Sequence, residues 1–138
     1  MKPTEKQLEE FVRGYLFAME WAEEEQLSRE GRTDVSVVHP DSLSASRNDC
    51  EAFVEEHFEI LEELGREALY SEEYPVWECL GHDFYFTRNG HGVGYWSRDF
   101  NREETEQLAK HISARVGHGT DYPPVTVYVG DDGFIHID

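Results

Sequence analysis

Hydrophobic positions recur with a helical period in two long stretches of the chain, residues 4–27 and residues 41–64. The apolar face of the first stretch consists of Leu8, Phe11, Val12, Tyr15, Met19 and Ala22. The apolar face of the second consists of Leu43, Cys50, Phe53, Val54, His57, Phe58, Ile60, Leu61 and Leu64. Thr4 and Gln7 have the spacing of a capping box, and Gly65 is a natural stop signal for the second stretch. We therefore predict two amphipathic helices.

The hydrophobic period then changes from helical to alternating. Residues 83–87 and 94–97 alternate in the manner of strands, and residues 70–79 between the second helix and these strands are expected to form a loop. The Asn-Gly pair at 89–90 favours a tight hairpin turn, because both residue types accept a positive φ. The pattern predicts a β-hairpin here.

Three further elements complete the predicted order. A third helix is expected over residues 101–116, and a second hairpin is expected from residues 125–129 and 134–137. Residues 35–38 could add a short strand. The prediction is a single α+β domain over residues 1–138, in the order ααββαββ. Its antiparallel sheet would have about four strands packed against helices.

The charge balance narrows the range of partners. The chain of 138 residues has 30 Asp and Glu against 12 Lys and Arg, a net charge of -18. Phosphates and anionic membrane surfaces are bound through Lys and Arg, so direct nucleic-acid and membrane partners are disfavoured. Aromatic residues make up 13% of the chain, which disfavours disorder.

Several sequence features favour a cytoplasmic protein. The first residues have no apolar segment of the signal-peptide kind, and no apolar run approaches the roughly 20 residues that span a bilayer. The two cysteines, Cys50 and Cys79, are too few to indicate a disulfide framework. No HExxH or CxxC motif occurs, and we expect neither a metal nor a cofactor.

Half of the net charge is concentrated in residues 51–79, which contain ten glutamates and one arginine. We call five of these glutamates, on the polar side of the second helix, the acidic stripe: Glu51, Glu55, Glu59, Glu62 and Glu63. With a rise of about 1.5 Å per residue, glutamates four residues apart are about 6 Å apart along the axis, similar to successive phosphates of a nucleic-acid strand. The stripe is therefore a candidate site for a protein partner with a basic surface.

A solvated helix face explains the same charge without a partner, and adaptation to a salty cytoplasm would do so too. Like charges four residues apart destabilise a helix by roughly 0.2–0.5 kcal/mol per pair, which weakly favours a compensating use. An acidic interaction protein, including a nucleic-acid mimic, remains the leading hypothesis.

Four aromatic residues form a second candidate surface. Phe17 and Trp21 project from the first helix on the side opposite its main apolar face. Tyr95 and Trp96 belong to the predicted first hairpin, where alternate side chains would be exposed. Such residues are typical interface anchors. Three roles are open for this aromatic patch. It could pack against the predicted sheet, bind a partner protein, or join copies of the chain into a self-associating scaffold protein such as a homodimer.

A polar site is the third candidate. His82, Asp83 and His136 could converge if the last strand lies beside the first predicted hairpin, giving a small enzyme or a metal- or ligand-binding module. His91 lies in the predicted turn, where it would be exposed and able to contact a partner. We assign no catalytic residue, because no nucleophile motif accompanies these side chains.

Four segments of the chain resemble a set of small bacteriophage and prophage proteins: residues 81–96, 11–15, 49–53 and 127–133. The most specific of them reads Gly-His-Asp-Phe-Tyr-Phe-Thr-Arg-Asn-Gly-His-Gly-Val-Gly-Tyr-Trp. The resemblance implies a phage or mobile-element origin and roles such as the inhibition of a host defence or a host enzyme. No activity is assigned to that group, so no catalytic residues carry over.

Overall fold

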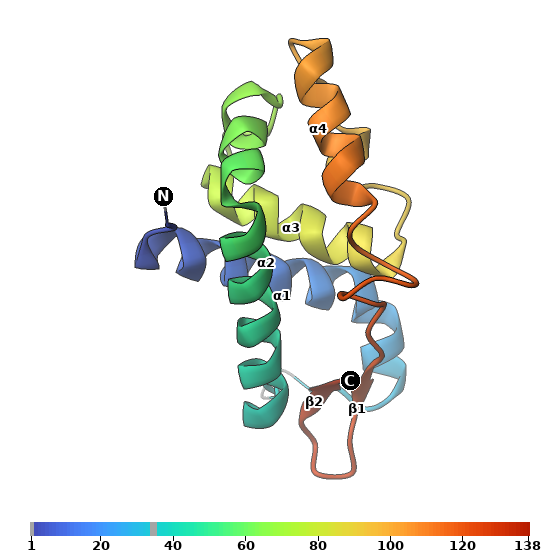
Figure 1. The fold of residues 1–138 in the computed structure, drawn as a ribbon. Helices are drawn as coiled ribbons and strands as arrows, with labels where there is room; N and C mark the ends of the chain where they lie inside the picture. The colour runs from blue at the N-terminus through green and yellow to red at the C-terminus, as the bar shows by residue number, and fades with distance from the viewer. Residues whose placement is uncertain (1, 34–35) are drawn as a thin grey trace.

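A computed structural model describes residues 2–33 and 36–138 of the chain. Its regular elements, in chain order, are the helices α1 (Glu5–Arg29), α2 (Pro40–Glu67), α3 (Val76–Asn89) and α4 (Glu103–Ser113), followed by the strands β1 (Val127–Val129) and β2 (Ile135–Ile137). A short 3₁₀ helix, η1 (Tyr95–Ser97), lies between α3 and α4. Figure 1 shows α1 and α3 side by side, with α2 crossing them and α4 beside the C-terminal half of α2.

The backbones of α1 and α3 touch where each helix has a glycine. A Cβ atom at Gly81 would lie 2.1 Å from the carbonyl oxygen of Phe11, and one at Gly14 would lie 2.1 Å from that of Glu78. Only glycine leaves room for this approach. The aromatic rings of α1 and α3, among them Tyr15, then pack directly against each other on either side of the contact.

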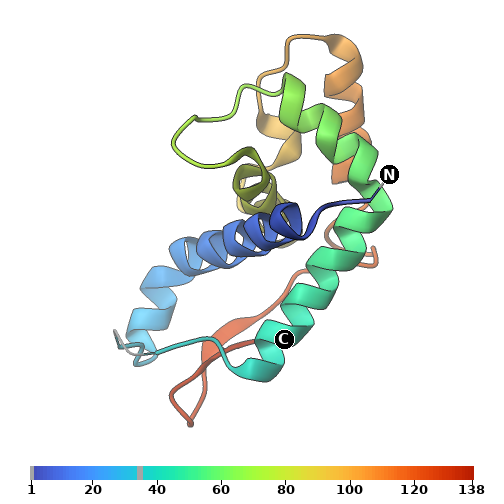
Figure 2. The same ribbon diagram turned by 90° about the vertical axis from the view of Figure 1, so that its left-hand side faces the viewer.

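The helix α2 is long but not continuous. His57 has a non-helical backbone (φ −118°, ψ 23°) and divides the helix into two parts. Phe53, one turn before this kink, stacks on Phe84 of α3 with ring centroids 4.2 Å apart. The N-terminal part of α2 and the end of α1 diverge, and the β1–β2 hairpin packs between them (Figure 2).

Local signals set several of the observed boundaries. The predicted capping box is confirmed, because Gln7 and Thr4 each accept a hydrogen bond from the other's backbone amide. The predicted hairpin near the C-terminus is also confirmed, with Val127 opposite Ile137 and Val129 opposite Ile135. None of the described helices is long and apolar enough to cross a membrane.

The predicted sheet of about four strands is wrong. The described part of the chain has one antiparallel sheet of two strands, and residues 83–87 of the predicted first hairpin belong to α3. This helix is buried between α1 and its other neighbours, so apolar residues lie on most of its circumference and no helical stripe stands out in the sequence. The Asn-Gly pair ends the helix instead of turning a hairpin, with Gly90 in the left-handed region (φ +65°).

Two smaller predictions also need correction. Gly65 does not stop α2, which continues to Glu67. The predicted strand at 35–38 lies partly outside the described residues. Within them, Val38 forms one isolated parallel bridge with Ile135, in which the Ile135 amide donates to the Val37 carbonyl oxygen at 2.9 Å and the His39 amide donates to the Ile135 carbonyl oxygen at 2.8 Å. The loop predicted over 70–79 is confirmed only in part, because α3 begins at Val76.

We predict that Gly81→Ala lowers the free energy of unfolding by about 1–3 kcal/mol or more, because the methyl group would push α3 away from the α1 backbone. Urea denaturation followed by circular dichroism measures the change. Gly65→Ala is the matched control, since its added methyl group meets only side-chain atoms, those of Val76 and Leu80, and no backbone, and alanine favours the helix. Equal losses in both variants would contradict the close contact of the two backbones.

Candidate functional site

The acidic stripe is only partly available to a partner. Glu51, Glu55 and Glu59 are exposed, whereas Glu62 and Glu63 are half-buried. The kink of α2 separates the first two glutamates from the others, so the five do not follow one straight helix.

Two arginines neutralise the end of the stripe. Glu63 accepts hydrogen bonds from Arg66, at 2.7 Å, and from Arg102 at the start of α4. These bonds, that from Arg66 foremost, hold the pKa of the Glu63 carboxyl below its usual range. Arg102 also lies 3.9 Å from a carboxylate oxygen of Glu67. The free negative surface of α2 therefore ends before Glu63.

At its other end the stripe continues across to α1. Glu51 shares a shallow hollow with Glu5 and Glu9 of α1, and the aliphatic floor of this hollow includes Leu8. Arg47 of α2 also lines it. The exposed carboxylates of α1 and of the N-terminal part of α2 thus form one acidic surface with a single arginine in it.

The four residues of the predicted aromatic patch lie at two separate places in the structure. Phe17 and Trp21 remain on the surface, with 46% and 66% of their areas exposed. Together with residues of α3 and of the preceding loop they line a hollow of about 250 Å³, which we call the aromatic hollow; its lining is Phe17, Ala18, Trp21, Tyr74, His82 and Phe86. Phe17 lies 5.8 Å from Tyr74 and Trp21 lies 6.0 Å from Phe86, measured between ring centroids.

The other two aromatic candidates lie on η1 and have different roles. Tyr95 is fully buried, and its hydroxyl donates a 2.7 Å hydrogen bond to the carbonyl oxygen of Leu80. It therefore belongs to the core. Trp96 is 49% exposed, and it does not line the aromatic hollow.

The polar candidates do not come together. Asp83 is buried in the core, where its carboxylate accepts hydrogen bonds from the Tyr70 hydroxyl at 2.8 Å and from the Arg98 guanidinium. Because both charges of this ion pair have hydrogen-bond partners, the pair stabilises the packing of the segment after α3 against that helix. Its neighbour His82 faces away from this pair, toward Phe17.

The other two histidines occupy two further settings. His91 follows α3 and lies 2.9 Å from Glu23 of α1. His136 of β2 stacks between His39 and Tyr128, and its Nε2 lies 3.0 Å from the Asp132 carboxylate. A catalytic or ligand site that joins His82, Asp83 and His136 is therefore not formed.

The hydrogen-bonding capacity of His82 is not fully used. Its Nε2 atom is buried and has no hydrogen-bond partner among the described residues. Burial lowers the pKa of this imidazole, so the neutral form is favoured at neutral pH. A neutral imidazole offers a partner one donor and one acceptor.

The main buried polar residue that the sequence analysis missed is Arg88 of α3. Its guanidinium donates to the carbonyl oxygen of Pro123 at 2.7 Å, to the Asp49 carboxylate at 2.9 Å and to the Tyr15 hydroxyl at 3.3 Å. Burial raises the pKa of Tyr15. Little in the sequence signals this role, because Arg88 stands between Thr87 and the Asn-Gly pair, just after the predicted strand.

The remaining chemically active side chains offer no site of their own. Cys50 and Cys79 are buried, and burial raises the pKa of both thiols, which disfavours the reactive thiolate. No group of three or more metal-ligating side chains is assembled among residues 2–33 and 36–138.

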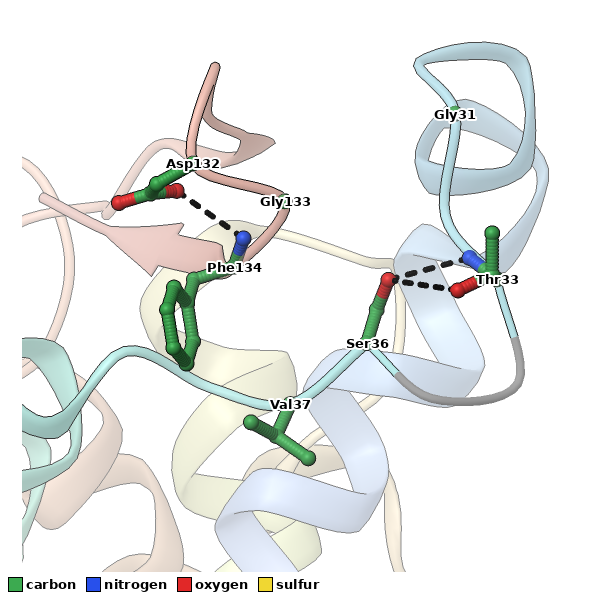
Figure 3. A pocket seen from close by; sticks show the side chains of 7 residues that line it. All are labelled: Gly31, Thr33, Ser36, Val37, Asp132, Gly133 and Phe134. Atoms are coloured by element: carbon green, nitrogen blue, oxygen red, sulfur yellow. Dashed lines mark hydrogen bonds between the residues drawn. The ribbon is translucent and has the colours of Figure 1, made fainter.

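A third hollow lies between the loop after α1 and the β1–β2 turn (Figure 3). The backbone amides of Thr33 and Phe134 point to it but donate within their own loops, to Ser36 Oγ and to Asp132 Oδ1. These polar groups are already satisfied, so the hollow offers a ligand few hydrogen bonds.

A scan of protein-family models and searches of curated proteins and of solved structures find no match to this chain. The assignment of function therefore depends on the geometry of the acidic surface and of the aromatic hollow.

We predict that the histidines His57 and His82, whose Nε2 atoms are buried, weaken the fold at acidic pH. Burial lowers the pKa of both in the folded state, so below a pH of about 6.5 the unfolded chain binds protons that the folded chain resists. The free energy of unfolding, from urea titrations at about pH 7 and about pH 5.5, should fall less on acidification in the variant His57→Gln/His82→Gln than in the wild type.

His118→Gln removes a histidine from an exposed position and should lose as much stability on acidification as the wild type. A double variant that loses stability as steeply as the wild type would show that other groups set the acid sensitivity.

Proposed function

We propose that the chain is a non-enzymatic acidic interaction protein that binds a basic surface of another protein. The supporting observation is that Glu51, Glu55 and Glu59 are exposed and have no ion-pairing Lys or Arg among the described residues, in a chain of net charge -18. Unpaired carboxylates repel one another across the surface that holds them. An approaching basic surface relieves that repulsion.

The contact would gain most from electrostatics. Clustered charges of one sign steer an oppositely charged partner and increase the association rate, an effect that salt screens. Glu51 and Glu55, which precede the kink of α2, are about 6 Å apart along the helix axis, like successive backbone phosphates, so a nucleic-acid-binding protein is the class of partner that fits best. The chain would then compete with nucleic acid for the groove of that protein.

The resemblance to phage proteins indicates which partners such an acidic protein would meet. An acidic protein made in the cytoplasm of an infected bacterium would meet basic host proteins that bind nucleic acid, including those of host defence. Occupying their basic grooves would inhibit them without any catalytic residue.

The alternative of a small enzyme finds less support in the arrangement of side chains. It requires His82, Asp83 and His136 to meet in one pocket, but Asp83 is neutralised in the core and His136 packs against His39. A self-associating scaffold protein would have to bring two copies of charge -18 together, which like-charge repulsion opposes.

We predict that Glu51→Gln/Glu55→Gln/Glu59→Gln weakens binding to an oligoarginine peptide more than a control with the same loss of charge. The control is Glu103→Gln/Glu104→Gln/Glu106→Gln, which neutralises three exposed glutamates of α4. Each unpaired carboxylate near a bound cation contributes roughly 0.2–1 kcal/mol, so the stripe variant should lose about threefold to tenfold or more in affinity at low salt. Fluorescence anisotropy of the labelled peptide measures the affinity of each variant.

The result that would contradict the proposal is an equal loss in both variants, which would mean that only the net charge acts. Wild-type affinity that does not change with salt would contradict it as well, because an interaction carried by exposed carboxylates must be screened. A second readout is competition, in which the wild type displaces duplex DNA from a basic DNA-binding protein and the stripe variant does so less well.

A further inference from the structure

The aromatic hollow is concave and apolar but is open to solvent. Trp21 exposes 66% of its area beside it, and Phe17 exposes 46%. An indole exposed to this extent, next to a second exposed ring, is unfavourable in water and typical of a surface that a partner covers. The acidic stripe does not account for it, because no residue of α2 lines the hollow.

One polar atom at the hollow lacks a partner. The Nε2 atom of His82 is buried and makes no hydrogen bond among the described residues, while the rings of Phe17 and Tyr74 pack around the imidazole, with centroids 5.6 and 5.2 Å away. A buried polar atom without a hydrogen bond is unfavourable. Because this atom is closed to solvent, a ligand in the hollow meets the imidazole of His82 as part of the apolar wall.

The charge around the hollow identifies the kind of ligand. Next to it, Phe17 and Trp21 also line a shallow depression with Glu20, Glu24 and Arg32. Arg32 lies 3.8 Å from Glu20, which leaves Glu24 exposed and without an ion-pairing partner among the described residues. The rim therefore has one unpaired negative charge on this side, that of Glu24, which complements a Lys or Arg side chain next to an apolar one.

We propose that the aromatic hollow binds a short basic segment of a partner protein, in which an aliphatic side chain enters between Phe17, Trp21 and Phe86 and a neighbouring Lys or Arg pairs with Glu24. A second copy of the chain is not the occupant, because each copy has a net charge of -18. The site goes beyond the acidic surface proposed above: it is on α1 and α3, and it selects apolar anchors as well as charge.

Three fluorescein-labelled peptides without aromatic residues test the proposal by anisotropy. The first alternates leucine with lysine, the second replaces leucine by serine, and the third replaces lysine by glutamate. We expect the wild type to bind the leucine–lysine peptide at least roughly tenfold more tightly than either control peptide. Trp21→Ala should weaken that binding by roughly tenfold or more, as removal of a central aromatic anchor does.

Trp96→Ala is the matched control, since Trp96 is similarly exposed but lies outside the hollow, and it should change the affinity by less than about twofold. Glu51→Gln/Glu55→Gln/Glu59→Gln should also keep the preference for leucine over serine, which separates this site from the acidic stripe. In NMR spectra of the imidazole nitrogens, the peptide should shift the signals of His82 and leave those of the exposed His118 in place.

Equal binding of the leucine and serine peptides, or equal effects of Trp21→Ala and Trp96→Ala, would overturn the proposal. Sedimentation of the wild type alone tests the remaining alternative, in which a second copy of the chain occupies the hollow. A dimer that is lost in Trp21→Ala would make a second copy the occupant and would overturn it too.

Discussion

The close contact between the backbones of α1 and α3 is the constraint on which the rest of the structure depends. Gly14 and Gly81 each leave space that the backbone of the other helix fills, so any side chain there would force the helices apart. Tyr15 and the aromatic residues of α3 pack beside this contact, and α2 closes over them through Phe53. The same contact forms the surface hollow, because Phe17 is one turn beyond Gly14 and His82 directly follows Gly81.

Burying α3 on several sides also buries charge, and the fold compensates for each charge with a specific partner. Asp83 is paired with Arg98, which ties the segment after η1 to α3, and Arg88 is paired with Asp49, which ties α2 to it. An unpaired charge at either position would be strongly destabilising. The segment from Gly81 to Arg98, which contains the most specific part of the predicted resemblance to phage proteins, therefore has a structural explanation in which no catalytic role is needed.

The elements that the sequence predicted well are those whose local signals agree with their surroundings. α1, α2 and the β1–β2 hairpin have one clear buried side, so the hydrophobic period identified them. α3 escaped prediction because its burial on most sides removes the period, and because an Asn-Gly pair suits both a hairpin turn and a helix end. The place of Trp21 on the helical wheel left its exposure open as one alternative to packing against a sheet, and the structure shows it exposed. The neutralisation of Glu63 by Arg102 depends on tertiary structure.

The two surfaces differ in what they can contribute to recognition. Exposed carboxylates act over about 8–10 Å at physiological salt and mainly raise the rate of encounter with any basic surface, so they discriminate poorly among such partners. An apolar hollow acts only on contact, and buried aromatic anchors mainly slow dissociation. Solubility alone would explain the glutamates of α2, but it does not explain Trp21, because an exposed indole lowers solubility. A partner that is both basic and apolar at its contact accounts for both features, since the negative rim of the hollow and the acidic stripe attract charge of the same sign.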